Sequence, residues 1–346
     1  MKIIQVVLGK ANPNRMNGVN NVVHHISTSL QRKKIDVEVW GITSSRDNDD
    51  FKREYNLKIF TRFLGRILPS FDLIRAILQE NNKSVNFHFH GAYIIEFVIL
   101  AAFLKVFGYK WFVTPHGAYS KNTLLKNNLL KTLYINTLDN IYIKKSQKVQ
   151  ALAPQERDDI LDCFTNIEVD TIPNGVNVPA TTRKKVNIVP DRYFVFCGRL
   201  HRQKGIDYLL DGYSLYISSG GKMELYIIGD GEERSYVRDF VESNSLQNQV
   251  RMLGVLFNED KNKIIENASA FVAPSRFEGF PIALLEAFSL NLPVVVSKET
   301  NFGNIVREND LGIELENTSP EIISSALFTI ESIPNDFYGE RPQEFV

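Results

Sequence analysis

Short β-rich segments alternate with longer helical patterns along the whole chain, and this alternation constrains the fold more than any other feature. It is typical of βαβ units with parallel strands and argues against a helical bundle or an antiparallel sandwich. The expected fold class is α/β with doubly wound parallel sheets. Strands are expected at residues 2–8, 37–42, 57–61, 85–89, 111–114, 148–151, 169–172, 193–196, 224–228, 250–253, 270–273 and 293–296, and helices of the second half near residues 205, 232, 260 and 280.

The alternation is interrupted once, between Ile172 and Asp191, by a segment rich in Pro, Asn, Thr and charge. This composition is typical of a turn and a linker. A chain of 346 residues also exceeds what one hydrophobic core usually organises. We therefore expect two domains, residues 1–176 and 177–346, with a ligand site in a cleft between the carboxyl ends of their sheets.

Charge is distributed unequally, although the net charge is zero. Residues 1–176 carry 23 Lys and Arg against 16 Asp and Glu, and the remainder carries 17 against 24. A basic first half is suited to anionic lipid or another negative partner, although such charge also serves solubility alone. Apolar segments are too short for a transmembrane helix or a secretory signal, so we expect a cytoplasmic protein, soluble or peripheral. Cys163 and Cys197 lack disulfide or zinc spacing and are expected to be buried free thiols.

Two cations, Arg199 and Lys204, follow an expected strand and precede a helix that begins near Gly205. A helix N-terminus exposes unpaired N–H groups and a positive dipole, so cations beside it form a site for a diphosphate. The alternative is that both are solvated loop charges. Their spacing alone does not decide between the two.

The segment from Ser275 to Ser297 repeats this arrangement and adds two carboxylates, Glu278 in a loop and Glu286 in the following helix. Pro281 is favoured at the first helical position, and Gly279 allows close backbone approach. Both carboxylates are placed to meet one extended ligand. Taken singly, Glu286 is as compatible with an ordinary solvent-facing helix position.

Two expected strands of the first half end in His-Gly, which places His90 and His116 at the same sheet edge. A single histidine is more often structural than catalytic, but two at equivalent strand ends favour a site. Gly18 lies at a strand-to-helix turn, where exposed amides can approach phosphate. A glycine turn of this kind is a weak signal.

Together these segments resemble the family 4 retaining glycosyltransferases, also called glycosyl transferases group 1. The resemblance covers most of the chain and implies the GT-B fold of two facing Rossmann-like domains. It is most specific in Glu278 and Glu286, which are separated by seven residues, and in the "LYIIGDGEE" segment. The other matching segments are Asn17-Gly18-Val19, Thr-Pro-His-Gly ending at Gly117, Ile-Pro-Asn-Gly at 172–175, and Gly-Arg-Leu with Lys204-Gly205 at 198–205.

The resemblance implies a nucleotide-diphosphate sugar donor, with a UDP- or GDP-sugar as the expected partner, held mainly by the second domain. Arg199 and Lys204 would neutralise the diphosphate and stabilise the departing charge without a metal. Glu286 would bind the ribose hydroxyls, and Glu278 the sugar hydroxyls. The donor would also lie along the backbone of Gly279, Phe280 and Pro281.

The resemblance gives the first domain an acceptor, a saccharide or a lipid-linked saccharide, in cell-surface polysaccharide synthesis. Gly18 would lie close to the phosphates, and His116 near the anomeric carbon of the transferred sugar. Members of the family commonly continue past the position of Val346 with helices that cross back onto the first domain. The crossover is therefore expected to be short or missing.

Other functions remain open. An Asp-x-Asp pattern at Asp47–Asp49 would suit a metal-dependent transferase, but it lies in a polar segment of mixed charge, and no metal or cofactor is expected. A nucleotide-sugar epimerase and a catalytically silent nucleotide-sugar binder are the alternatives in other classes. No G-x-G-x-x-G follows a strand and opens a helix, which argues against a nicotinamide enzyme. No nucleic-acid partner is expected.

Residues 121–148 contain six lysines and one aspartate among leucines and isoleucines at helical spacing. A basic amphipathic helix of this kind can lie on an anionic bilayer. The alternative is a helix that packs on the core and exposes a lysine face. Both interpretations stay open at the level of sequence.

Overall fold

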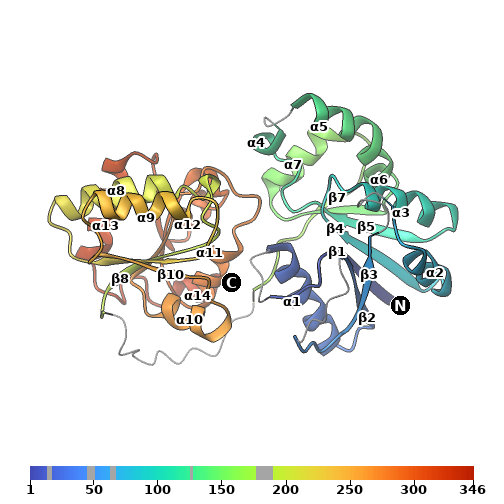
Figure 1. The fold of residues 1–346 in the computed structure, drawn as a ribbon, viewed down its shortest axis with the longest axis horizontal. Coiled ribbons are helices and arrows are strands. Elements are labelled where there is room, and N and C mark those ends of the chain that lie inside the picture. Colours follow the sequence, from blue (N-terminus) through green and yellow to red (C-terminus); the bar gives the residue numbers. More distant parts are fainter. Residues whose placement is uncertain (14–17, 45–50, 63–67, 125–127, 177–189) are drawn as a thin grey trace. The chain divides into compact units, whose positions relative to one another are not determined.

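The computed structural model describes residues 1–13, 18–44, 51–62, 68–124, 128–176 and 190–346. It forms two compact units, Met1–Asn174 and Gly175–Val346, each built on its own sheet with helices packed against it (Figure 1). The segment that was expected to join the domains, residues 177–189, lies outside the described residues.

The described part of the first unit contains a parallel sheet in the order β3-β2-β1-β4-β5-β6-β7. The order reverses between β1 and β4, which is where open sheets of this type place ligands at their carboxyl edge. The strands are β1 (Lys2–Leu8), β2 (Val37–Thr43), β3 (Asn56–Thr61), β4 (Val85–His90), β5 (Lys110–Thr114), β6 (Lys148–Ala151) and β7 (Val169–Thr171). The helices are α1 (Gly18–Arg32), α2 (Phe71–Gln79), α3 (Ile95–Val106), α4 (Lys121–Leu124), α5 (Asn128–Tyr134), the π-helix η1 (Ile135–Asp139), α6 (Asn140–Lys144) and α7 (Pro154–Cys163).

The two faces of this sheet carry different side chains. On one face, aromatic residues of β2 and β4 pack with α2, α3 and α6 in a large core. On the other face, a smaller core under α1 covers β1, β2 and the start of β3. Beyond it, that face carries a row of polar side chains from β1, β4, β5 and β6, here called the polar row. Its members are Gln5, His88, His90, Thr114 and Gln150.

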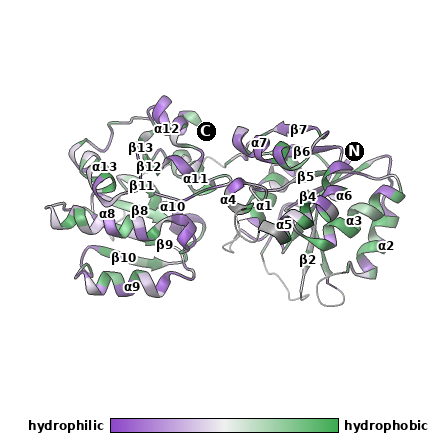
Figure 2. Cartoon of the chain, turned by 90° about the horizontal axis from the view of Figure 1, so that it is seen from above, coloured by the Kyte–Doolittle hydropathy of each residue, from purple (hydrophilic) through white to green (hydrophobic). Residues whose placement is uncertain are grey.

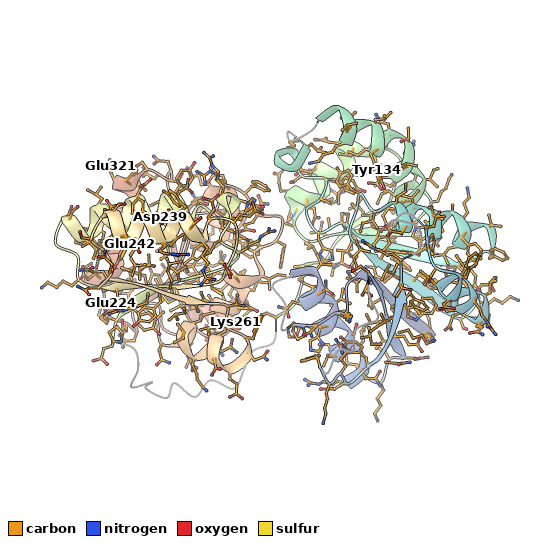
Figure 3. All side chains as sticks on the ribbon, in the orientation of Figure 1. Tyr134, Glu224, Asp239, Glu242, Lys261 and Glu321 are labelled. Atoms are coloured by element: carbon orange, nitrogen blue, oxygen red, sulfur yellow. The ribbon has the colours of Figure 1, made fainter. Side chains whose placement is uncertain are left out.

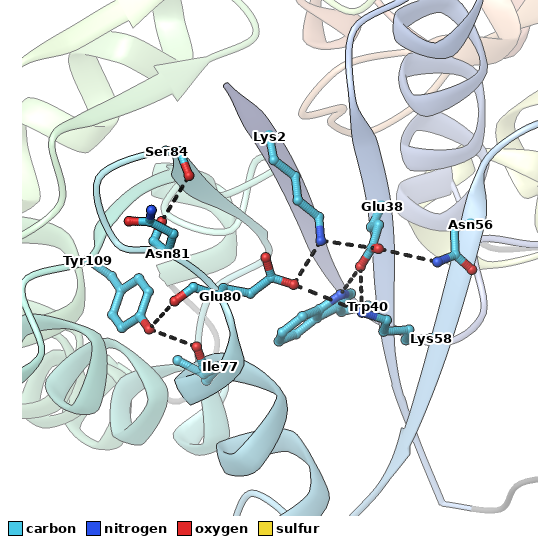
Figure 4. Close-up of polar contacts among 10 residues, drawn as sticks. All are labelled: Lys2, Glu38, Trp40, Asn56, Lys58, Ile77, Glu80, Asn81, Ser84 and Tyr109. Carbon is cyan, nitrogen blue, oxygen red and sulfur yellow. Dashed lines mark hydrogen bonds and ion pairs between the residues drawn. The ribbon is translucent and has the colours of Figure 1, made fainter.

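Charged side chains of β1, β2, β3 and α2 form a bonded network beside the large core (Figure 4). Lys2 Nζ contacts Glu38 at 3.1 Å and Glu80 at 2.7 Å. Burial raises the pKa of Glu38, but hydrogen bonds from Trp40, Lys58 and Lys2 outweigh it and lower the pKa to about 2. The network ties α2 to the sheet and leaves no charge of this group unopposed.

The described part of the second unit contains a parallel sheet in the order β10-β9-β8-β11-β12-β13. Its strands are β8 (Tyr193–Cys197), β9 (Glu224–Ile228), β10 (Val250–Gly254), β11 (Ala270–Ala273), β12 (Val294–Ser297) and β13 (Gly312–Leu315). Its helices are η2 (Arg202–Lys204), α8 (Ile206–Ser218), α9 (Arg234–Ser243), α10 (Asn258–Glu266), α11 (Ile282–Ser289), η3 (Lys298–Thr300), α12 (Gly303–Glu308), α13 (Pro320–Ser332) and α14 (Arg341–Phe345).

Both faces of the second sheet are covered by hydrophobic cores, because its strands are apolar at most positions. Along β8, Phe194 and Phe196 enter the core with α8, α9 and α13, while Tyr193 and Val195 enter the core with α10, α11 and α12. Side chains of a strand alternate between faces, so one apolar run supplies two cores. Figure 2 shows how hydropathy differs among the helices. Helix α9 contains both hydrophilic and hydrophobic residues, whereas α3 of the first unit is mostly hydrophobic.

The fold class prediction of two Rossmann-like parallel sheets is confirmed, and every expected strand is present within one or two residues. The strand β13 and the helices α12, α13 and α14 were not predicted. Of the helix expected over residues 121–148, the described residues 128–144 form one helical run, in which α5 continues through η1 into α6. Its single aspartate, Asp139, is fully buried and accepts a hydrogen bond from Tyr119 at 2.7 Å. Within the described ranges, no helix combines the length and apolar character needed to cross a membrane.

Candidate functional site

Two turns at the carboxyl edge of the second sheet meet where β8 and β11 end. After β8, the chain passes through η2 to Gly205, which has a φ of 65° and opens α8. A Cβ on Gly205 would overlap the carbonyl oxygen of Pro274, directly after β11. Glycine is therefore needed both for the left-handed backbone and for the close approach of the two turns. This approach brings Lys204 next to Glu278.

Lys204 and Glu278 form a two-pronged ion pair. Lys204 Nζ lies 2.7 Å from Oε1 and 2.8 Å from Oε2 of Glu278. The Ser275 hydroxyl also donates to Oε1 at 2.8 Å, and the Glu278 side chain is only 9% exposed. An ammonium group has three donors, so Lys204 keeps one for a ligand oxygen after binding both carboxylate oxygens. The carboxylate is fixed in one orientation.

A second ion pair locks the two turns together on the outer side. Arg276 donates to both carboxylate oxygens of Asp207, at 2.7 and 2.6 Å, and its guanidinium lies 3.8 Å from the Tyr208 ring centroid. Burial raises the pKa of Asp207, but the Arg276 hydrogen bonds outweigh it and lower the pKa. The Gln203 side chain also donates to the Phe277 carbonyl at 3.1 Å. The turns thus form a rigid platform beneath Lys204 and Glu278.

Glu286 binds a cation that sequence reasoning missed. Lys261 of α10, labelled in Figure 3, lies with Nζ 2.8 Å from Glu286 Oε2 of α11, and both side chains are less than one fifth exposed. Burial lowers the pKa of Lys261, but the Glu286 carboxylate more than offsets this and raises the pKa. Lys261 occurs in the polar segment "NEDKNK", which has the appearance of a solvated helix surface, so no sequence signal separated it from its neighbours.

The Cys197 thiol lies among these charged groups. It is half-buried at the end of β8, and burial raises its pKa to about 12. Lys261 and Lys204 act against this rise, and Glu286 adds to it, so all three charges are close enough to affect the thiol. Lys204 with Glu278 and Lys261 with Glu286 therefore surround one point at the carboxyl edge of the sheet. Both cysteines are free, as expected, but half-buried rather than buried.

Arg199 is not brought into this group. Its guanidinium lies 2.8 Å from Glu232, and the two side chains are 57% and 65% exposed. A pair this exposed contributes little to stability, so the Arg199 side chain is available for rearrangement.

The remaining residues of the second turn lie close to the start of α11. Gly279 and Phe280 are half-buried, and Pro281 is the buried N-cap of α11. Phe280 packs edge-on against Phe302, with ring centroids 5.5 Å apart.

In the first unit, His116 and His90 lie side by side. His116 Nε2 is 3.0 Å from His90 Nδ1, and burial lowers the pKa of His116 to about 3. Gly18 is exposed at the start of α1, and its neighbour Asn17 lies outside the described residues. The turn before α1 is held by Asn20, whose Oδ1 accepts from Ala11 N at 2.8 Å.

The Asp47–Asp49 segment with its Asp-x-Asp pattern also lies outside the described residues. Among the residues that the structure does describe, no three His, Cys, Asp or Glu side chains are grouped so as to hold a metal ion. The described part of the site is thus built from paired lysines and glutamates, which suits a ligand that combines an anionic group with several hydroxyls.

The family of the chain follows from two sequence profiles that together cover almost all of it. Residues 16–179 match Glycosyltransferase Family 4, and residues 179–340 match Glycosyl transferases group 1. With two Rossmann-like units and paired charges at a carboxyl sheet edge, the chain belongs to the family 4 group 1 glycosyltransferases of the GT-B fold.

Relatives in sequence come from archaea, yeast and bacteria. The chain is 33% identical over 129 residues to an uncharacterized glycosyltransferase of Methanocaldococcus jannaschii, which is 37% of this chain and 31% of that protein. It is 27% identical over 281 residues to the phosphatidylinositol N-acetylglucosaminyltransferase GPI3 subunit of Saccharomyces cerevisiae, which is 77% of this chain and 60% of that protein. The chain thus spans less than two thirds of the length of either relative.

Solved structures share the fold at low identity. Sucrose-phosphate synthase from Thermosynechococcus elongatus has a TM-score of 0.80 at 15% identity, over 99% of this chain and 94% of that chain. HepE from Anabaena, solved in complex with UDP and glucose, has a TM-score of 0.77 at 15% identity, over 100% of this chain and 94% of that chain.

Proposed function

We propose that the protein transfers a sugar from a nucleotide-diphosphate sugar, a UDP- or GDP-sugar, to a saccharide or lipid-linked saccharide acceptor, with retention at the anomeric carbon and without a metal. The observation that carries the proposal is the grouping of Lys204, Glu278, Lys261 and Glu286 around the end of β8. Family membership and the UDP held by HepE support a nucleotide-sugar donor.

The donor would be bound by complementary charge. Glu278 holds the Lys204 ammonium group in place, and the third N–H of this group donates to the diphosphate. Arg199 breaks its exposed ion pair with Glu232 and binds the diphosphate instead. Glu278 and Glu286 accept hydrogen bonds from the sugar and ribose hydroxyls, and the backbone of residues 279–281 lies alongside. The exposed Gly18 at the start of α1 is a further candidate for a phosphate contact.

The chemical step requires stabilisation of a leaving diphosphate. Charge develops on the phosphate oxygen as the anomeric bond breaks, and preorganised cations at that oxygen lower the barrier. Lys204→Ala removes such a cation, so transfer is expected to slow on the order of 10²-fold, or about 3 kcal/mol. Retention follows if the acceptor attacks on the face that the diphosphate leaves, with the phosphate accepting the acceptor proton.

The first experiment is a thermal-shift panel of UDP- and GDP-sugars with and without EDTA. A bound donor raises the apparent stability by mass action, and a shift that survives EDTA supports metal-independent binding. Release of free UDP or GDP with an acceptor present, lost in Lys204→Ala and Glu286→Ala, supports transfer. Binding without release would favour a silent nucleotide-sugar binder, and sugar rearrangement without an acceptor would favour an epimerase.

Peripheral contact with an anionic membrane is a second part of the proposal. Leu130 and Leu133 of α5 are 73% and 62% exposed, Ile141 of α6 is also exposed, and Lys144 and Lys145 follow on the same helical run. Exposed apolar side chains beside lysines are suited to anionic lipid headgroups. The name of one relative, a phosphatidylinositol N-acetylglucosaminyltransferase subunit, is in line with a lipid-linked acceptor.

Liposome flotation tests this contact. The protein is expected to float with vesicles that contain anionic lipid at low salt, and Leu130→Glu combined with Leu133→Glu is expected to abolish flotation. Val106→Glu, at an exposed position at the end of α3, is the matched control and should float as the unchanged protein does. Equal flotation of all three variants, or none at all, would remove the membrane from the proposal.

A further inference from the structure

The polar row is unusual for a parallel sheet, whose two faces normally bury aliphatic side chains. Two of its members, Gln5 and His90, are 1% and 2% exposed. Burying polar groups this deeply costs free energy unless they are hydrogen-bonded. Each donor must therefore face an acceptor, and this pairing shows which ring nitrogen carries the proton.

One chain of hydrogen bonds leads from Gln5 through His90 to His116. His90 Nε2 lies 2.6 Å from Gln5 Oε1, and His90 Nδ1 lies 3.0 Å from His116 Nε2. A carboxamide oxygen only accepts, so the His90 proton lies on Nε2 and its Nδ1 is an acceptor. The contact with His116 then requires the His116 proton to lie on Nε2.

Both imidazoles are neutral, and for His90 the chain of bonds requires this because its Nδ1 must accept from His116. Burial lowers the pKa of His90 well below its usual value, and burial lowers that of His116 to about 3. A neutral imidazole has one donor and one acceptor nitrogen. With Nε2 protonated, His116 presents Nδ1 as an acceptor, and no described residue hydrogen-bonds to that nitrogen.

We propose that His90, anchored by Gln5, is a positioning residue that fixes His116 in the Nε2-protonated tautomer, so that its Nδ1 accepts a hydrogen bond from a hydroxyl of the transferred sugar. The identity of the ligand rests on the proposed function, whereas the proton positions rest on the geometry alone. In this arrangement Gln5 and His90 act only through His116.

The backbone at His116 is held as firmly as its ring. His116 and Gly117 have φ values of 57° and 77°, and the Gly117 amide donates to Glu156 at 2.5 Å. Glu156 also accepts from the Leu152 amide at 2.7 Å. A non-glycine residue in the left-handed region persists only where its surroundings hold it there, and such positions cluster at functional sites.

His88 supplies a matched control from the same strand. Its Nε2 lies 2.7 Å from the Thr114 hydroxyl, which donates to Gln150 at 3.0 Å. This second chain of bonds does not reach His116. His88→Gln therefore alters the polar row and removes the ring contact of His88 with His90, whose centroids are 4.3 Å apart, but it removes no hydrogen bond of the Gln5–His90–His116 chain.

The direct test is the proton position in the whole protein labelled with ¹⁵N-histidine. The protein has six histidines, so long-range ¹⁵N–¹H correlation with His116→Gln as the assignment variant identifies the His116 signals. We expect His116 to carry its proton on Nε2, and to become a mixture of tautomers in His90→Leu but not in His88→Gln. A His116 proton on Nδ1, or an unchanged His116 tautomer in His90→Leu, would overturn the proposal that His90 fixes this tautomer.

Kinetics separate positioning from a merely structural role. His90→Leu is expected to lower kcat about tenfold with KM for the donor nearly unchanged, since one aligned hydrogen bond is lost. His90→Asn restores an acceptor near the position of Nδ1 and should recover part of kcat, and His88→Gln should match the unchanged protein. Equal losses in His90→Leu and His90→Asn with normal unfolding midpoints would overturn the assignment. If no donor gives any transfer, the proposed function fails, and the tautomer of His116 still decides the relay.

Discussion

At the scale of single residues, the candidate site depends on which carboxylate each lysine binds. Arg199 and Lys204 were predicted to act as a cationic pair, and Glu278 and Glu286 as an acidic pair. The structure instead forms mixed pairs, Lys204 with Glu278 and the unpredicted Lys261 with Glu286. Mixed pairs keep each carboxylate in one orientation before any ligand arrives, which reduces the entropy lost on binding.

The first prediction concerns Lys261. Lys261→Met leaves the half-buried Glu286 carboxylate without its partner, so the free energy of unfolding should fall by about 1–3 kcal/mol. Urea unfolding followed by far-UV circular dichroism measures this. Adding Glu286→Gln removes the unpaired charge and should restore part of the loss. A double variant as unstable as the sum of both single changes would show that the two side chains are not coupled.

The second prediction concerns pH. Burial lowers the pKa of His88 to about 4 from an ordinary 6.5, so the unfolded chain binds a proton between these values and the folded chain does not. Stability is therefore present above pH 6.5 and lost as the pH falls toward 4, by about 2 kcal/mol at pH 5. His88→Gln keeps a donor for Thr114 but does not titrate, so it should lose that much less stability between pH 7 and pH 5.

Tryptophan fluorescence measures this pH effect selectively, because Trp40 and Trp111 are the two tryptophans of the chain and both lie in the first unit. His90 and His116 also have lowered pKa values and remain in the variant. The measurement therefore compares how steeply the free energy of unfolding falls with pH in the unchanged protein and in His88→Gln. Identical slopes in the unchanged protein and His88→Gln would contradict the assigned pKa of His88.

At the scale of elements, the second unit depends on close helix packing. The helices α8 and α13 lie on the same face of the sheet, and Gly212 of α8 faces Ile323 of α13. A Cβ at position 212 would lie 2.5 Å from the Cβ and Cγ2 atoms of Ile323, which is closer than real side chains approach. The helices can approach this closely only because position 212 has no side chain.

The third prediction follows from that contact. Gly212→Ala improves the helix propensity of α8 but overpacks the core, and the net destabilisation should be about 1–3 kcal/mol. The matched control is Ser325→Ala on the exposed side of α13, which should change stability by less than about 0.5 kcal/mol. Urea unfolding followed by circular dichroism measures the stability of both variants. A Gly212→Ala variant more stable than the unchanged protein would show that α8 and α13 can move apart without cost.

At the scale of the whole molecule, each unit has its own hydrophobic cores, so the two units can respond differently to a ligand. The large and small cores of the first unit and the two cores of the second share no residues across Asn174 and Gly175. A ligand stabilises the unit to which it binds by mass action. The proposed donor contacts lie mainly in the second unit.

The fourth prediction uses this separation. UDP is expected to raise the temperature of the far-UV transition of the second unit by several degrees at about 100 times its dissociation constant, while the tryptophan transition of the first unit shifts less. Lys204→Ala should abolish both shifts. An equal shift in both transitions would show that the units unfold together or that the first unit contributes as much to binding.

Local sequence patterns were enough to predict all but one strand of the two sheets, and the carboxyl edge at which the candidate residues lie. Apolar runs such as Tyr193–Cys197 and Ala270–Ala273 carry their strand signal locally, and a residue that follows a parallel strand is fixed at one edge of the sheet. Short elements such as β13 gave no comparable local signal, because four residues with one glycine fit a loop equally well.

The partners of the charged and polar side chains become known only from the folded chain. Lys204 and Glu278 are 74 residues apart in the chain, and Gln5 and His90 are 85 apart. A hydrogen bond or ion pair depends on distance and direction within a few tenths of an ångström, and no pattern in residue type encodes these. The sequence can predict that a charged or polar side chain lies at an edge of the sheet. Which atom it binds depends on how the folded chain packs.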